Sequence, residues 1–127
     1  MTRPTRPISW IKGALKDFDA FPIAARDEFF LALSIVAEGK HPDIAKPLKG
    51  LGSGVLELAL KFRGDAYRVV YAVQIGADIW VVHAFQKKSK QGIATTQVDL
   101  DLIDQRLKRA KQEYEQWLKN ETSRTFR

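Results

Sequence analysis

The stretch from residue 55 to residue 85 constrains the fold of this chain more than any other. Residues 55–62 alternate between leucine or phenylalanine and charged or small residues, which is typical of a strand with one buried face. Residues 66–75 and 79–85 are rich in β-branched and aromatic residues, which favour strands. Because only short glycine-containing turns separate the three stretches, we expect three neighbouring strands that run antiparallel.

Helices are predicted before and after these strands. A short helix is expected over residues 12–18, and a longer one over residues 22–39, with a proline at its start and a glycine at its end. Farther along, Thr96 and Asp99 have the spacing of a capping box, and apolar residues then recur every three or four positions. That pattern predicts a long helix that ends near Lys119.

The predicted elements fit one α+β domain that spans residues 1–127, because a chain of this length with 45% hydrophobic residues can bury one core. We expect a small antiparallel sheet of three to four strands, two N-terminal helices and a long C-terminal helix. Residues 8–11 are a candidate for the additional strand. Residues 1–7 are expected to form an extended arm, and residues 120–127 a frayed tail.

Composition excludes several classes of site. The chain has no cysteine and two histidines, so disulfides, thiol nucleophiles and Cys-ligated metals are excluded and a His-rich metal site is not expected. No apolar run is long enough for a membrane span, and no apolar segment follows the N-terminal arginines as in a signal peptide. We therefore expect a cytoplasmic protein. Its net charge of +6 favours a polyanionic partner.

A cationic patch is predicted on the first hairpin. A two-residue or four-residue loop around the Gly-Asp pair places Lys61 opposite Arg68, with Arg63 beside Lys61 on the same face. Like charges opposed across two strands repel each other unless an anion such as phosphate neutralises them. The alternative is an ordinary solvated face on which Asp65 or Glu57 screens the cations.

A second basic group, residues 86–91, follows the third strand and contains Lys87, Lys88 and Lys90. If the strands are antiparallel, this group returns to the end of the sheet that bears Lys61. Several cations on one rim would suit the backbone of a nucleic acid, although a charged loop can also be merely solvated.

The orientation of His83 depends on the second turn. A two-residue turn after Ile75 sends Trp80 and its alternate neighbours to the core, whereas a three-residue turn sends His83 there. A single histidine on a strand is either a structural residue or a proton-transfer group of the site.

Two stretches resemble the RelE/ParE superfamily of toxins, and most of all its HigB-like, phage-derived branch. Residues 55–71 end in Tyr-Arg-Val-Val-Tyr, and residues 80–91 contain His-Ala-Phe-Gln-Lys-Lys. The Leu-Lys-Gly-Leu run at 48–51 and the terminal helix extend the resemblance over about residues 8–119. It implies a RelE-like fold, a role as the toxin of a type II toxin–antitoxin pair, and cleavage of mRNA on the ribosome. The implied partners are a helix-turn-helix antitoxin, the ribosome and mRNA, with no metal or small-molecule cofactor.

The resemblance also implies which side chains act. We expect Lys61 to be the general base, because nearby cations favour a neutral amine, and Arg63 and Arg68 to stabilise the negative phosphorane. Lys88 would protonate the leaving oxygen, and the remaining RNA contacts would come from Lys87, Lys90 and His83.

One feature departs from the RelE pattern, because residues 92–94 read Gly-Ile-Ala, where RelE has a tyrosine in the equivalent segment. Two alternatives therefore stay open: a ParE-like toxin that acts on DNA gyrase without cleaving RNA, and a non-toxic basic binding module.

Overall fold

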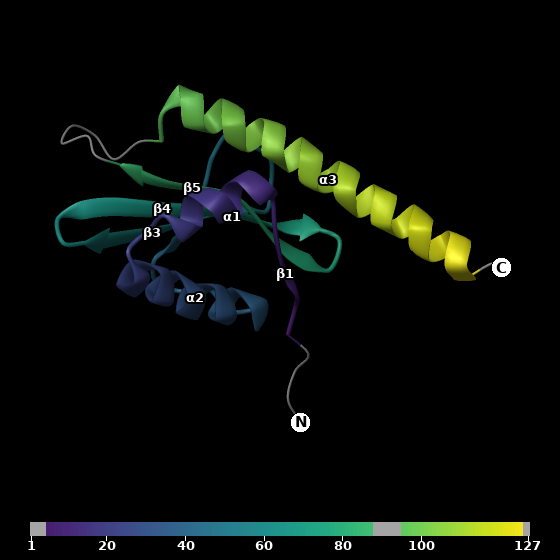
Figure 1. Cartoon of the computed structure of the whole chain (residues 1–127), viewed down its shortest axis with the longest axis horizontal. Coiled ribbons are helices and arrows are strands. Elements are labelled where there is room, and N and C mark those ends of the chain that lie inside the picture. Colours follow the sequence, from purple (N-terminus) through teal and green to yellow (C-terminus); the bar gives the residue numbers. More distant parts are fainter. Residues whose placement is uncertain (1–4, 88–94, 126–127) are drawn as a thin grey trace.

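The computed structural model describes residues 5–87 and 95–125 of the chain. Along the sequence the elements are β1 (Ile8–Trp10), α1 (Lys12–Asp19), α2 (Ile23–Ala37), β2 (Ala45–Pro47), β3 (Val55–Phe62), β4 (Asp65–Ile75), β5 (Asp78–Lys87) and α3 (Gln97–Thr125). The α+β class, the two N-terminal helices and the long C-terminal helix are confirmed (Figure 1).

The sheet has five strands in the order β1-β5-β4-β3-β2, and it is mixed rather than antiparallel. β1 runs parallel to β5, with Ile8 paired with Ile79. The three neighbouring antiparallel strands expected over residues 55–85 are confirmed as β3, β4 and β5, and β2 is also antiparallel. The expected total of three to four strands is too low, and the expected antiparallel direction is wrong for β1. β1 and β2 span three residues each, too few for a hydrophobic pattern to show either their pairing or their orientation.

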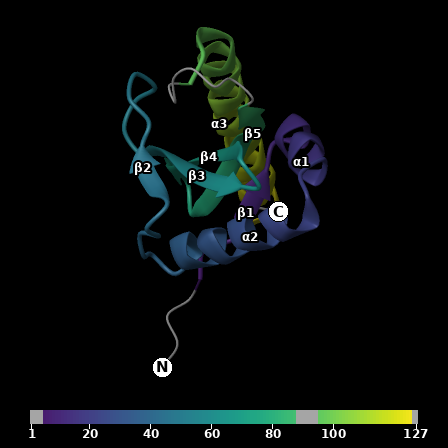
Figure 2. The same cartoon turned by 90° about the vertical axis from the view of Figure 1, so that its left-hand side faces the viewer.

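Helices cover both faces of the sheet. Figure 2 shows α3 over one face, with α2 below the opposite face and α1 beside β5. Tyr67 of β4 packs against Phe21, between α1 and α2, at 4.9 Å between ring centroids. Successive residues Val69 and Val70 are both fully buried, because one points to α1 and α2 and the other to α3.

The first hairpin closes by a turn other than the expected one. Phe62 pairs with Asp65, and the two turn residues Arg63 and Gly64 have φ values of 52° and 85°. Two residues with positive φ make the turn that matches the twist of paired strands, and glycine adopts it without steric cost. The expected register is therefore wrong by two positions, although each side chain of the paired strand residues keeps its face.

The second hairpin has a two-residue turn, since Ile75 pairs with Asp78. Two irregularities interrupt the pairing of β4 with β5, and Val82 has no partner in the register. The sequence predicted that either Trp80 or His83 would point to the core, and the interrupted pairing of β5 allows both. Trp80 pairs with Ala72 and His83 pairs with Val70, so both lie on the face that α3 covers, and both are buried there.

The start of α3 agrees with the predicted cap. The backbone N–H of Asp99 donates to Oγ1 of Thr96 at 3.3 Å, and that hydroxyl donates to the Asp99 carboxylate at 2.7 Å. The helix continues past the expected end at Lys119 to Thr125, so most of the segment expected to fray is helical. Its distal part extends beyond the sheet (Figure 1), and Trp117 there is 55% exposed.

Over the residues described, none of the three helices combines the length and the apolar content that a membrane span requires.

Candidate functional site

Charged side chains from three strands gather on the face of the sheet that α3 partly covers. Cross-strand partners share a face, and here they form three successive rows over β3, β4 and β5. From the rim inward the rows are Lys61–Ala66–Lys87, Ala59–Arg68–Phe85 and Glu57–Val70–His83. The three rows define the candidate site.

The outer row, which we call the rim, carries accessible cations. Lys61 and Lys87 flank Ala66 from opposite sides, so they lie two strands apart, about 10 Å. Lys61 is exposed and Lys87 half-exposed. The expected convergence of the first hairpin with the end of β5 is thus confirmed for Lys87. Lys88 and Lys90 lie outside the described residues.

Arg63 occupies the turn next to the rim. It is exposed, and its guanidinium carbon lies 5.2 Å from the centroid of the Phe62 ring, which is within range of a cation–π contact. Phe62 follows Lys61 in β3 and points to the opposite face of the sheet, so the Arg63 side chain lies toward that opposite face at the hairpin tip. The expected placement of Arg63 on the same face as Lys61 is therefore wrong.

Arg68, in the second row, is not an exposed cation. Its Nη1 donates to Oε1 of Glu57, and the two side chains are 5% and 1% exposed. Thr95 donates to the other Glu57 oxygen at 2.9 Å, and Lys46 Nζ lies 4.0 Å from the first. Glu57 therefore neutralises Arg68, and the expected repulsion between Lys61 and Arg68 is replaced by a buried ion pair.

The ion pair between Arg68 and Glu57 stabilises the folded protein as long as both partners are present. Removing one partner of a buried pair leaves an uncompensated charge and typically costs about 3–5 kcal/mol. The Nε of Arg68 is buried and has no hydrogen-bond partner among the described residues. Arg68 thus keeps one donor unused beneath the rim.

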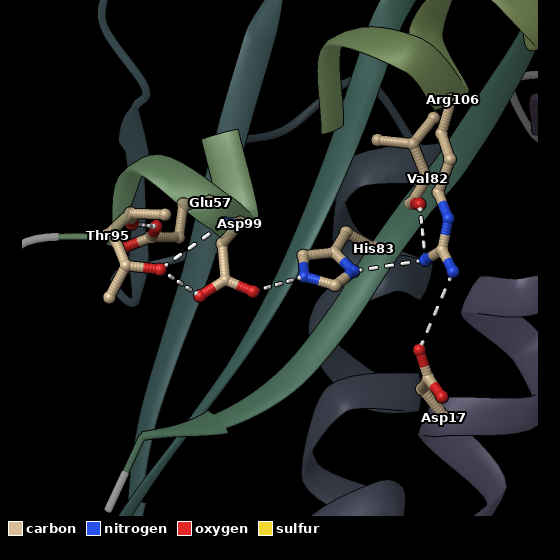
Figure 3. Close-up of polar contacts among 8 residues, drawn as sticks. Asp17, Glu57, Val82, His83, Thr95, Asp99 and Arg106 are labelled. Carbon is tan, nitrogen blue, oxygen red and sulfur yellow. Dashed lines mark hydrogen bonds and ion pairs between the residues drawn. The ribbon is translucent and has the colours of Figure 1, made fainter. Parts of the chain in front are cut away.

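His83, in the third row, belongs to a chain of polar contacts that links β5 to two helices (Figure 3). Its Nε2 lies 2.9 Å from Oδ1 of Asp99, and its Nδ1 lies 3.0 Å from Nη1 of Arg106. Arg106 also donates to the carbonyl of Val82 at 3.2 Å and lies 3.7 Å from Asp17 of α1.

These contacts assign the protonation of His83. A guanidinium can only donate, so Nδ1 of His83 accepts and Nε2 carries the proton that is donated to Asp99. Burial, reinforced by the charge of Arg106, lowers the pKa of His83 below its ordinary value of 6.5, although Asp99 opposes the shift. His83 is therefore a neutral imidazole with both nitrogens engaged.

Tyr71 follows Val70 in β4 and faces the opposite side of the sheet from the three rows. The side chain is fully buried, and burial raises the pKa of its hydroxyl to about 12. This hydroxyl stays protonated at neutral pH.

Sequence reasoning missed most of the acidic partners in this site. Glu57 was considered only as a screen, although a carboxylate within a strand buried on both faces needs a cationic partner. Asp99 and Arg106 lie seven positions apart, on the side of α3 that also carries the buried Ile103. Asp99 and Arg106 are charged residues on the apolar side of a helix, and this pattern was the signal that could have identified them as inward-facing.

The arrangement separates two tasks. Exposed amines and a guanidinium at the rim can contact phosphate oxygens, while the ion pair and the histidine chain beneath them hold the strands and α3 in place. Over the part of the chain that the structure describes, no three His, Asp or Glu side chains are grouped to hold a metal ion.

Comparisons with known proteins support the same fold. The isolated toxin RelE of E. coli superposes with a TM-score of 0.52 and 19% identity, covering 79% of this chain and 97% of that one. A double arginine-to-alanine variant of E. coli RelE in the free state gives 0.53 and 19%, covering 68% and 88%. At this identity the likeness establishes the fold alone.

No protein with a curated function matched the sequence. The sequence pattern of the phage-derived Gp49-like proteins (DUF891), in contrast, matches residues 16–108, which include α2, all of β3 to β5 and the first part of α3. The chain therefore belongs to the phage-derived Gp49-like family, and its fold is that of the RelE toxin.

Proposed function

We propose that this protein is the toxin of a type II toxin–antitoxin pair, and that it inhibits translation in the cytoplasm by cleaving mRNA on the ribosome. The observation that carries the proposal is the rim, where Lys61 and Lys87 flank Ala66 on one face of a RelE-like sheet. The cognate antitoxin, a small helix-turn-helix protein, would block this face.

The proposed reaction needs no metal. The 2′-oxygen of the RNA attacks the adjacent phosphorus, the bond to the 5′-oxygen breaks, and a 2′,3′-cyclic phosphate and a 5′-hydroxyl result. Lys61 takes the proton of the 2′-hydroxyl, and Lys88 gives a proton to the leaving 5′-oxygen. Arg63 is exposed at the tip of the hairpin, two positions along the chain from Lys61, and its fork suits the phosphorane oxygens.

The remaining residues of the site have supporting roles. Lys87, together with Lys90, contacts flanking phosphates. Arg68 and His83 are positioning residues in this proposal, because Glu57 and Asp99 already engage them. Arg68 holds β3 beneath Lys61, and His83 holds α3 over the sheet.

Expression in bacteria without a partner tests the proposal. The unchanged protein should arrest growth, and primer extension on cellular mRNA should show cuts in phase with codons. The double variant Lys61→Ala, Lys87→Ala should lose both effects. The matched control, Lys111→Ala with Lys119→Ala, removes two exposed lysines from α3 and should keep both.

Other outcomes would contradict the proposal. Growth arrest with DNA damage and intact mRNA would instead indicate a gyrase poison of the ParE kind. Normal growth during expression of the unchanged, folded protein would indicate a non-toxic binding module.

A further inference from the structure

A second cationic surface lies away from the rim, in a groove between α1 and α3. The groove has a volume of about 940 Å³, and Ile11 and Leu102 contribute apolar surface to it. Figure 1 shows the two helices that form its walls. It shares no residue with the rim, which is built on β3, β4 and β5.

Cations enter the groove from both walls. Lys12 and Lys16 come from α1, and Arg106, Lys108 and Arg109 come from α3. A single carboxylate, that of Glu113, is among the lining residues, and the other polar lining side chains are three glutamines. The groove is therefore electropositive and rich in hydrogen-bonding groups.

Two lysines of α1, Lys12 and Lys16, line the groove close to each other. They are exposed and one helical turn apart, a spacing at which like charges repel. Among the described residues, neither Lys12 nor Lys16 has a carboxylate within 4.0 Å. This pair of unneutralised charges favours an anion in the groove.

The charges of α3 are only loosely neutralised. Lys108 lies 3.1 Å from Asp104, and Arg109 lies 3.8 Å from Glu113, in ion pairs whose side chains are about half-exposed or more. Pairs of this kind typically contribute about 0–1 kcal/mol, so a phosphate can replace the carboxylate at little cost.

Arg106 fixes the distance between the two walls. Its guanidinium bonds to β5 and lies 3.7 Å from Asp17 of α1, and a Cβ on Gly13 would clash with it. The absence of a side chain at Gly13 lets this arginine reach across the base of the groove. The cations are therefore held on a preformed surface.

We propose that this groove binds the sugar–phosphate backbone of RNA, as a second contact separate from the strand that is cleaved at the rim. Its α3 wall runs from Leu102 to Gln116, about 21 Å along the helix axis. Lysines and arginines contact phosphates, and glutamine side chains bond to phosphate and sugar oxygens. The choice of RNA as the polyanion rests on the proposed function.

Binding of a short single-stranded 2′-O-methyl RNA, which cannot be cleaved through its 2′-oxygen, tests the inference by fluorescence anisotropy over a series of salt concentrations. Lys12→Ala with Lys16→Ala should weaken affinity about ten-fold at moderate salt. It should reduce the slope of log affinity against log salt by about 1.4, since each lost phosphate contact on a single strand removes about 0.7. The control Lys111→Ala with Lys119→Ala changes two exposed lysines outside the groove. Its decreases in affinity and in salt slope should be less than half of those of the groove variant.

The rim variant Lys61→Ala, Lys87→Ala, measured in the same assay, separates the two proposals. If it loses affinity while the groove variant binds like the control, the groove inference is overturned and the proposed function stands. If the groove variant loses affinity and the rim variant does not, the groove inference holds and the proposed role of the rim in RNA binding is contradicted. Groove-dependent binding of poly-glutamate but not of RNA would assign the groove to an acidic protein and overturn the inference.

Discussion

Lys61 and Lys87 at the rim differ from Arg68 and Arg106 beneath it in how their charge is balanced. The rim lysines are accessible, whereas Arg68 is paired with the buried Glu57 and Arg106 lies 3.7 Å from Asp17 of α1. A buried cation must be neutralised by the protein itself, while an exposed cation can be neutralised by a ligand. The burial of a cation, more than its place in the sequence, thus separates structural charges from binding charges in this fold.

The largest effect is expected at the buried ion pair. Arg68→Met should lower the free energy of unfolding by about 3–5 kcal/mol, because Glu57 would remain buried without its partner. Urea unfolding followed by circular dichroism measures the change. The double variant Arg68→Met, Glu57→Leu removes both charges and should recover much of the loss. A single variant as stable as the unchanged protein would place Arg68 among the ligand-binding cations instead.

A smaller effect is expected from the titration of His83. Because burial lowers its pKa in the folded state, the unfolded chain binds more protons below pH 6.5. Stability should therefore be complete above that pH and should fall as the pH drops through 6.5 toward the folded pKa. Thermal unfolding at a series of pH values between about 7.5 and about 5.5 measures this loss of stability.

The variant His83→Gln is the control for this titration. It keeps a donor for Asp99 but cannot titrate, so its stability should depend less on pH over the same range. A pH dependence equal to that of the unchanged protein would show that another group is responsible.

The smallest effect on stability is expected at the rim. Lys61→Ala and Lys87→Ala should each change the free energy of unfolding by no more than about 0.5 kcal/mol, because an exposed lysine outside a network contributes little. The same urea titration measures both. A loss as large as that of Arg68→Met would erase the distinction between the rim and the buried pair.

The strands of the central sheet could be predicted because each repeats a simple pattern. β3 has the predicted bounds, and the helices appear where proline, glycine and the Thr96 cap indicated. The register could not be predicted, because Arg63 adopts a positive φ that a sequence pattern assigns to glycine. A shift of two residues in the pairing of β3 with β4 keeps every side chain on its face of the sheet but gives it a different cross-strand partner.

The site was harder to predict than the fold, because ion pairs depend on that register. With the expected pairing, Arg68 faces Lys61; with the observed one, it lies in the row next to Glu57 and can reach it. The apolar stripe of α3 could have marked Asp99 and Arg106 as inward-facing charges, but their contacts with His83 depend on how α3 packs on β5, which no local pattern shows.

Cleavage of a ribosome-bound mRNA by purified protein tests the central claim most directly. The reaction would compare the unchanged protein, the Lys61→Ala, Lys87→Ala variant and the Lys111→Ala, Lys119→Ala control, each confirmed as folded. We expect metal-independent cleavage by the first and third proteins and a loss of about 100-fold or more for the rim variant, the scale of losing a proton-transfer group. Equal cleavage by all three proteins, or none by the unchanged protein, would contradict it.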